Sequence, residues 1–415
     1  MNTLNATEVI RPVKPQALTP EKRLRKMVEV LTDKWGDRKD SLLDYKAEAL
    51  LITGKEKHHH YEIRTLYIGA LSNCDFILNK VYDLYDVVKK ENSNIWGIRS
   101  HLRILGQLAD LIVMDIPWPY QFLLPRNQFI ESPAWVCQRT AISLEWSEVE
   151  RKFSKEARTE DFRKIRKYGL SYETTTDPKD IETFYDQMYC PYLTNRFGDL
   201  ASIEPRWKIR HFAQKGKLLQ IKRDGHVIAA AVLYEWKKCM HFLWTGTREE
   251  PGTPLGRGAF SALYYYSMLH AFESSCDSID FEGTRPFLND GIFLFKRKWG
   301  SYVCDGWSLD TFLFQPKNFG PAVISFFANN PLVIRGENGL AGKILFHNEG
   351  KACTPVDLEG LVKRYGGSGL KHLGVASTSG YDPDAWEYAR SSPQNMHLVD
   401  LSKLEKPAQQ IFTTK

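Results

Sequence analysis

The sequence predicts a mixed α/β protein whose central region is a sheet flanked by helices. Two tight turns, Asp224-Gly225 and Lys237-Lys238, separate three runs that are rich in strand-forming residues. These runs span 218–222, 227–236 and 239–246. Hairpin turns join antiparallel neighbours, so the three runs are expected to form consecutive antiparallel strands.

A helical crossover follows these strands and makes the expected sheet mixed. A glycine-containing loop at 253–258 precedes a helix predicted at about 259–274, and a fourth strand is predicted at 278–283. A strand–helix–strand connection places its two strands parallel. A short helix at 291–299 and a closing strand at 307–314 complete the pattern.

The rest of the chain predicts four parts. Residues 1–19 show little periodicity and predict a flexible arm. Residues 20–134 predict a helical N-terminal lobe with a loop-rich connection, because apolar residues between 66 and 88 recur at helix-like spacings. Residues 135–318 hold the mixed sheet, and the strand and helix patterns in 319–415 predict a small C-terminal α/β unit.

The composition is that of a folded, water-soluble protein, with 43% hydrophobic and 26% charged residues. No segment approaches the roughly 20 apolar residues that span a bilayer. The first residues also lack the apolar core of a signal peptide, so the cytoplasm is the expected compartment. The seven cysteines form no C-x-x-C pair and are expected to be reduced. A net charge of +6 permits an anionic cofactor without requiring nucleic acid.

The turn Gly256-Arg257-Gly258 is a candidate phosphate site. It is expected to open a helix directly after a strand, where free backbone N–H groups attract anions and glycines let a phosphate approach the backbone. The charge of Arg257 would add to this attraction. An ordinary strand-to-helix turn would explain the same residues, and only the strand order favours the cofactor interpretation.

The strand at 278–283 carries the candidate catalytic carboxylates. Residues alternate between faces along a strand, so Asp280 and Glu282 share one face. Such a pair suits removal of a proton from an incoming amine, although salt bridges to Arg285 or Lys296 would account for it equally well. His241, on the preceding strand, is a further candidate base, and a packed histidine is the alternative.

Two neighbouring motifs are the most specific in the chain. They read D-F-E-G-T-R at 280–285 and G-I-F-L-F-K-R-K-W-G at 291–300. Together with the basic helix at 151–170, they resemble the signature of FemAB-like acyltransferases, a branch of the GNAT superfamily. The resemblance covers about 135–314 and implies a GNAT-like mixed sheet flanked by helices, which agrees with the strand order above.

The resemblance implies acyl or aminoacyl transfer to an amine or a hydroxyl group. It implies that Lys296 lies near the reacting carbonyl, where a cation stabilises a developing oxyanion. It implies that Asp280 lines the cleft, and that Arg166 and Arg196 contact an anionic donor or acceptor.

The sequence departs from the family pattern at Glu282, where relatives usually carry glycine, and at Phe293, where many carry tyrosine. The second departure removes an obvious hydroxyl acid. Tyr264 and Arg285 complete the expected substrate-binding residues, with stacking of a base on Tyr264 weighed against simple packing.

We therefore expect an N-acyltransferase that uses a thioester donor, acyl-CoA or an acyl carrier protein, and no metal. The expected acceptor is an amine of a sugar, a cell-wall precursor or another polar metabolite. The domain lacks the long helical-hairpin insertion of tRNA-dependent relatives, which favours the thioester. An aminoacyl-tRNA-dependent transferase and a non-catalytic binding scaffold remain alternatives. A metal nuclease tail using Glu349 and Lys351 is a weaker one.

Overall fold

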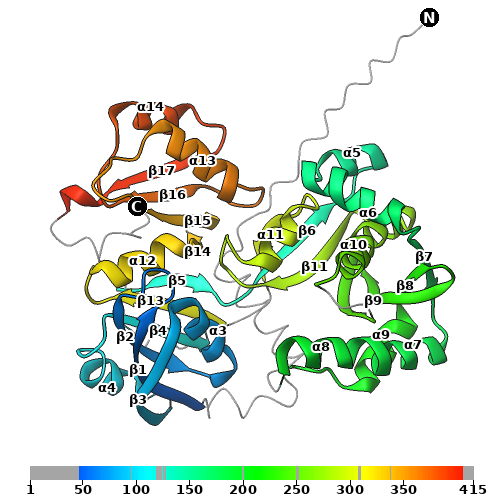
Figure 1. Ribbon diagram of the computed structural model, residues 1–415, viewed down its shortest axis with the longest axis horizontal. Coiled ribbons are helices and arrows are strands. Elements are labelled where there is room, and N and C mark those ends of the chain that lie inside the picture. The colour runs from blue at the N-terminus through cyan, green and yellow to red at the C-terminus, as the bar shows by residue number, and fades with distance from the viewer. Residues whose placement is uncertain are drawn as a thin grey trace, which may run out of the picture. The chain divides into compact units, whose positions relative to one another are not determined.

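Three sheets organise the described part of the chain (Figure 1). The computed structural model describes residues 46–404 apart from 95, 118–123, 125–127, 199–200, 249–251, 307–309 and 337. We name the sheets A, B and C in chain order. The expected mixed α/β class with helix-flanked sheets is confirmed.

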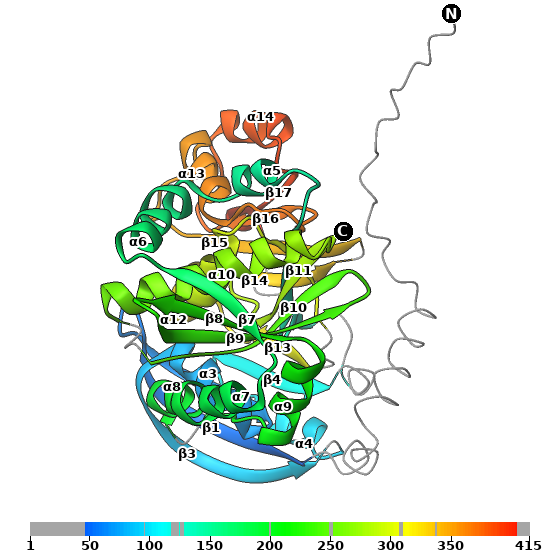
Figure 2. The same ribbon diagram turned by 90° about the vertical axis from the view of Figure 1, so that its right-hand side faces the viewer.

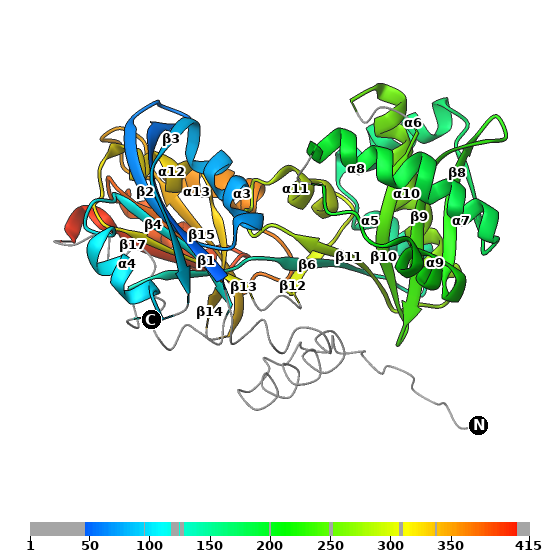
Figure 3. The same ribbon diagram turned by 90° about the horizontal axis from the view of Figure 1, so that it is seen from below.

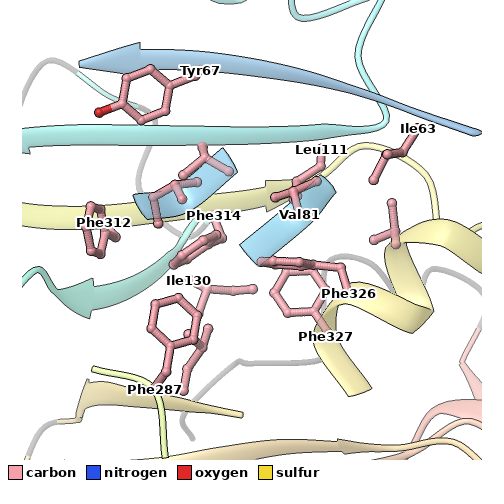
Figure 4. Packing of buried hydrophobic residues seen from close by; sticks show 14 of the residues in the cluster. Ile63, Tyr67, Val81, Leu111, Ile130, Phe287, Phe312, Phe314, Phe326 and Phe327 are labelled. Atoms are coloured by element: carbon pink, nitrogen blue, oxygen red, sulfur yellow. The ribbon is translucent and has the colours of Figure 1, made fainter. Parts of the chain in front are cut away.

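Sheet A has the strand order β3-β1-β2-β4-β13-β5. Its strands are β1 (Lys46–Glu56), β2 (Glu62–Gly69), β3 (Tyr82–Asn94), β4 (Leu111–Pro117), β5 (Ile130–Pro133) and β13 (Asp310–Pro316). Helices α3 (Leu71–Val81), α4 (Ile98–Ile104) and α12 (Pro321–Asn329) accompany it. Phe326 and Phe327 of α12 pack with Phe314 of β13 in the core of this region, as Figure 4 shows.

The helical lobe expected at 20–134 is wrong for the described residues, because 46–94 form mainly strands. β1 pairs with β2 as a hairpin and with the later strand β3, and these ladders override the local helix-like spacing. Part of the apolar pattern marks no buried face, since Leu84 and Val88 of β3 are 74% and 61% exposed. Only α3 preserves the expected helix there. The predictions for 1–45 lie outside the described residues.

Sheet B has the strand order β12-β6-β11-β10-β9-β8-β7. Its strands are β6 (Val136–Ala141), β7 (Ser171–Thr175), β8 (Lys217–Arg223), β9 (His226–Trp236), β10 (Cys239–Thr247), β11 (Ser278–Thr284) and β12 (Tyr302–Asp305). The predicted meander is confirmed, because β8 and β9 and then β9 and β10 pair antiparallel. Both hairpin turns use left-handed backbone, at Asp224, Gly225, Lys237 and Lys238.

Helices cover both faces of sheet B (Figure 2). One face carries α5 (Trp146–Arg151), α6 (Phe162–Lys167) and α10 (Pro254–Glu273), with a π-helical turn at Ala157–Asp161 leading into α6. The other face carries α7 (Pro178–Phe184), α8 (Cys190–Phe197) and α9 (Arg206–Lys215), with a π-helical turn at Tyr185–Tyr189 between α7 and α8. The short helix α11 (Gly291–Arg297) follows β11.

The closing strand predicted at 307–314 does not join this sheet. Its described part falls in β13, which pairs antiparallel with β4 and β5 in sheet A. β12 and β6 close sheet B instead, beside β11. Three buried phenylalanines draw the later segment into the sheet A core: Phe312 and Phe314 on β13, and Phe287 nearby.

Sheet C forms the C-terminal α/β unit, and its expected strand–helix alternation is confirmed. It has the order β14-β15-β16-β17. Its elements are β14 (Leu332–Gly336), β15 (Gly339–Phe346), α13 (Pro355–Tyr365), β16 (Leu373–Ser377), α14 (Pro383–Ser391) and β17 (Met396–Asp400). β15, β16 and β17 are parallel, and α13 and α14 cover one face of them (Figure 1).

The described residues from 46 to 404 cluster as one compact unit, so the three sheets share contacts. Val136 of β6 and Phe293 of α11 pack in the same buried cluster as Val375 of β16. Within the described helices, none combines the length and the hydropathy that a bilayer crossing requires. The described cysteines are all free thiols, as their spacing predicted.

Candidate active site

The two parallel neighbours in sheet B, β10 and β11, separate after three paired residues. β10 and β11 pair only at Cys239↔Ser278, Met240↔Ile279 and His241↔Asp280, although both strands continue beyond these residues. Figure 3 shows β6, β11 and β10 in this part of the sheet. The strands are unpaired with each other beyond this point, and their separation starts beside two candidate catalytic residues.

A backbone irregularity in β11 accompanies the divergence. The register of β11 against β6 shifts between Asp280 and Gly283, and Glu282 adopts a left-handed φ of 61°. Oδ1 of Asp280 accepts the Glu282 N–H at 2.8 Å, which fixes this conformation. A non-glycine residue with positive φ is uncommon and costs conformational energy, so the surrounding hydrogen bonds must hold it. The bulge therefore sets the direction of the Glu282 carboxylate.

His241 and Glu282 form the most accessible polar pair at this point. Nδ1 of His241 lies 2.9 Å from Oε1 of Glu282, and the two side chains are 19% and 26% exposed. Burial opposes protonation of His241, but its hydrogen bonds with Cys239 and Glu282 outweigh that effect and raise its pKa to about 10. The pair therefore holds an imidazolium against a carboxylate at neutral pH.

Asp280 lies directly beside this pair, and each of its carboxylate oxygens accepts a hydrogen bond. Its side chain is 3% exposed, Oδ2 accepts from Nε of Arg139 at 2.7 Å, and Oδ1 accepts the Glu282 N–H. The Asp280 charge contributes to a raised pKa of Arg139, although burial of Arg139 acts in the opposite direction. Asp280 thus links β6 to β11, and its burial limits its access to an incoming amine.

Lys296 lies beside the same bulge, and its ammonium group makes three hydrogen bonds. It is 4% exposed, and its Nζ donates to the carbonyls of Glu282 and Gly283 and to Oγ1 of Thr284, at 3.2, 2.9 and 3.0 Å. Burial lowers its pKa to about 8, against the opposing effect of nearby Cys137, Glu282 and Asp280. An ammonium has three donors, so this one has none left for an oxyanion. The role expected for Lys296 does not fit this geometry.

Helices from opposite faces of sheet B meet where β10 and β11 separate. The rings of Tyr192 on α8 and Phe260 on α10 lie 5.3 Å apart. Tyr264 packs beside them against Phe281 and Phe295, and it is only 7% exposed. Burial raises the pKa of Tyr264. Its role in the described structure is packing, the alternative that the sequence also allowed.

Arg196 lies near the same aromatic group. It is exposed, donates to the Tyr192 hydroxyl and stacks on Tyr192 and Phe197 of α8. Its charge opposes the effect of burial on the pKa of Tyr264, which places the guanidinium within electrostatic reach of that phenol. The structure therefore brings Arg196 and Tyr264 together at the separation of the two strands.

The glycine turn is helical rather than a loop. α10 begins at Pro254 with Thr253 as its N-cap, and Oγ1 of Thr253 accepts the Gly256 N–H at 3.0 Å. Gly256 and Gly258 therefore lie inside the first turns, and a side chain at Gly258 would contact Lys164 and Tyr168 of the neighbouring segment. Helix–helix packing explains this glycine, and Arg257 remains exposed beside it.

Arg166 and Arg285 are not brought to the His241–Glu282 pair by contacts in the described structure. Arg166 is exposed on α6. Arg285 is half-buried against Trp135 and Phe76, with its guanidinium 3.8 and 4.5 Å from their ring centres, and it donates to Asn73. Burial lowers the pKa of Arg285 to about 10. Arg285 therefore supports the junction between sheets A and B.

A family model assigns the region that contains this geometry. Residues 151–287 match the model described as an acetyltransferase (GNAT) domain. The chain carries a GNAT domain. The matched range includes β7 to β11 and α10, so the meander, the helical crossover and the separated strands all fall within it. The GNAT domain also contains His241, Asp280 and Glu282, whereas Lys296 lies beyond the match.

Solved structures resemble the chain distantly. FemX shares 15% identity at a TM-score of 0.35, over 64% of this chain and 83% of its own. L-PGS from Bacillus licheniformis shares 12% identity at a TM-score of 0.33, over 76% of this chain and 96% of its own. A tandem GNAT protein from the clavulanic acid biosynthesis pathway shares 12% identity at a TM-score of 0.29, over 74% of this chain and 92% of its own. The search of curated proteins found no match.

A metal could be held at this site by its residue types alone. Across the described ranges, His241, Asp280 and Glu282 are the group whose ligand atoms lie close enough, within 4.8 Å of one another. Each oxygen of Asp280 accepts one hydrogen bond, from Arg139 and from the Glu282 N–H. Glu349 belongs to no such group among the described residues.

The His241–Glu282 ion pair predicts an unusual titration within the GNAT domain. We expect the C2 proton of His241 in an NMR spectrum to keep its protonated shift from pH 6 to 8, because the pKa of the folded state is near 10. Since this pKa exceeds the unfolded value of about 6.5, the pair stabilises the fold fully below pH 6.5, and the stabilisation declines as the pH rises toward 10. In Glu282→Gln the titration midpoint should fall. A midpoint near 6.5 in the wild type contradicts the ion pair.

Sequence reasoning missed two residues of this network, Arg139 and Cys239. Arg139 reaches Asp280 from β6, which is 141 positions away in the chain. Cys239 lies two residues before His241 on the same face of β10 and contributes to the raised pKa of His241. The period-two pattern of β10 was sufficient to pair Cys239 with His241, but nothing in the sequence located β6 beside β11.

Proposed function

We propose that the protein is an N-acyltransferase in which the His241–Glu282 pair performs acyl transfer from a thioester to an amine. The observation that carries the proposal is the position of this pair. It is partly exposed and hydrogen-bonded at 2.9 Å, and it lies where β10 and β11 separate. The GNAT match over 151–287 supports the same class of chemistry.

The roles follow from charge and accessibility. The amine nitrogen attacks the thioester carbonyl, the C–S bond breaks, and the acyl group passes directly to nitrogen. Glu282 is the carboxylate with accessible area, so it is proposed to take the proton from the amine. His241 is held protonated and is proposed to stabilise the oxyanion and to protonate the departing thiolate.

Asp280 and Lys296 are proposed to position this pair rather than to react. Asp280 holds the Glu282 backbone in its left-handed conformation, and Lys296 binds the Glu282 and Gly283 carbonyls from below. Both side chains are buried, whereas a reacting group must reach the substrate. This assignment replaces the general-base and oxyanion roles that the sequence suggested for them.

The proposed donor is acyl-CoA or an acyl carrier protein. Its phosphates are proposed to lie at the start of α10, where backbone N–H groups and the exposed Arg257 favour an anion. The acyl group would lie beside Tyr192, Phe260 and Arg196, where helices from the two faces meet. The proposed acceptor is an amine of a sugar, a cell-wall precursor or a polar metabolite, and the proposed compartment is the cytoplasm.

The donor is tested with acetyl-CoA and longer acyl-CoA species. We expect acyl-CoA to raise the thermal midpoint of the wild type and to release free thiol when an amine panel is added. Arg257→Ala should weaken donor binding several-fold because it removes one positive charge near the phosphates. Arg248→Ala is unsuitable as a control because Arg248 bonds to Gln187, so the exposed Lys237→Ala serves instead.

The failed outcomes separate the two alternatives. Binding of aminoacyl-tRNA with a steep salt dependence, without binding of acyl-CoA, would replace the thioester by a tRNA donor. Acyl-CoA binding without thiol release, over the full amine panel, would leave a donor-binding scaffold without transferase activity.

A further inference from the structure

Three basic side chains lie on one face of sheet C, outside the matched range 151–287. They are Lys343 on β15, His372 immediately before β16 and His397 on β17. The two histidine rings are stacked, with centroids 4.1 Å apart and planes inclined by 17°. Lys343 is only 4% exposed, whereas His397 is exposed. The cluster therefore runs from the protein interior to solvent.

Gly374 allows Lys343 to reach across the sheet. The parallel register places Lys343, Gly374 and His397 in one row across β15, β16 and β17. A Cβ atom at position 374 would lie 2.6 Å from Nζ of Lys343 and 2.9 Å from its Cε, so any other residue would clash with the lysine. The lysine side chain thus lies over β16, on the side from which His397 projects.

The cluster has no negative partner among the residues that the structure describes. Lys343 forms no hydrogen bond or ion pair there, and Nε2 of His372 is buried without a hydrogen-bond partner. Burial lowers the pKa of Lys343. Burial, then His397 on β17 and Lys343 on β15, lower the pKa of His372 to about 4, and no carboxylate acts on it.

A largely buried ammonium without a hydrogen-bond partner costs free energy, and the stacked imidazoles beside Lys343 carry no negative charge to offset that cost. A bound anion would offset it. The three nitrogen groups can donate together to different oxygens of one tetrahedral oxyanion, and lysine is a common phosphate ligand. Lys343 and His372 thus carry donor groups that no acceptor among the described residues pairs with.

We propose that Lys343, His372 and His397 form a binding site for a phosphate-class oxyanion, either free phosphate or the phosphoryl group of a larger ligand. The site is separate from the GNAT domain and does not depend on the acyl transfer proposed for it. Because the anion favours the protonated imidazole, binding takes up a proton and is expected to tighten as the pH falls from 7 toward 5. The groups that act on His372 in this range are Lys343 and His397.

The first test is titration of the full-length protein with inorganic phosphate, followed by calorimetry and thermal denaturation. We expect Lys343→Met to weaken phosphate binding at least ~10-fold, because it removes a charged donor. The matched control is Lys371→Met. Lys371 is exposed just before β16, so this substitution should change phosphate affinity by no more than about twofold. Without phosphate, Lys343→Met should denature at a higher temperature than the wild type. An equal phosphate response in wild type and Lys343→Met overturns the proposal.

A second measurement does not depend on a variant. The C2 proton of His372 is followed by NMR in the wild type, with inorganic phosphate, with a phosphate monoester, and with chloride at matched ionic strength. We expect phosphate to raise the pKa of His372 and chloride to leave it unchanged. A response to the monoester at lower concentration assigns the site to a larger phosphorylated ligand, and a stronger response to inorganic phosphate assigns it to the free ion. No change with either phosphate species overturns the proposal.

Discussion

Glu282→Gln is expected to reduce acyl transfer by roughly 10²–10⁴-fold, the contribution typical of a positioned general base. Glutamine keeps the size of the side chain and its hydrogen bond to His241, so the bulge in β11 should persist. The loss should therefore appear in kcat, with donor binding largely retained. Steady-state rates of thiol release, with acyl-CoA in excess, measure it.

The control for this variant is Glu235→Gln, which neutralises an exposed carboxylate on β9, the strand beyond β10 in sheet B. Its rate should remain within about twofold of the wild type, as expected for a surface substitution. If Glu282→Gln retained full activity with an unchanged pH profile, the base would have to be sought elsewhere in the GNAT domain.

Lys296→Met is expected to lower the free energy of unfolding by about 2–4 kcal/mol, because it removes the donor from two buried carbonyls. Those carbonyls belong to Glu282 and Gly283, so the same change should also release the bulge and lower activity. Urea denaturation followed by circular dichroism measures the first effect, and Lys237→Met on the exposed hairpin turn is the matched control. An unfolding free energy equal to that of the wild type would show that the Lys296 hydrogen bonds do not stabilise the fold.

The same variant has a pH signature with a definite sign. The pKa of Lys296 is lowered to about 8 in the folded chain, below its unfolded value of about 10.4. Between these values the unfolded chain binds more protons, so this group makes the wild type more stable as the pH rises. The stability of the wild type relative to Lys296→Met should therefore grow from pH 8 to 10.

The elements with local determinants were predictable from the sequence. The turns at Asp224-Gly225 and Lys237-Lys238 adopt the left-handed backbone that such hairpins need, and α10 and β11 follow in the expected order. The helix start was placed five residues late, although Thr253 followed by Pro254 is a recognisable cap. The glycines at 256 and 258 diverted the interpretation toward a loop.

Long-range pairing accounts for most of what the sequence could not predict. β2 pairs with β4, and β13 joins sheet A, because of contacts between segments far apart in the chain. In the candidate site, alternation predicted that Asp280 and Glu282 share a face, but it could not predict the bulge that separates their roles. Arg139 is the clearest case, since only the completed sheet brings it to Asp280.

The chain passes between two sheets twice, from β5 to β6 and from β12 to β13. A fragment cut to 151–287 would therefore omit both β6 and β12 and leave the backbone of β11 unpaired on one side. Unpaired strand edges form hydrogen bonds with other chains, so this fragment should self-associate rather than stay monomeric.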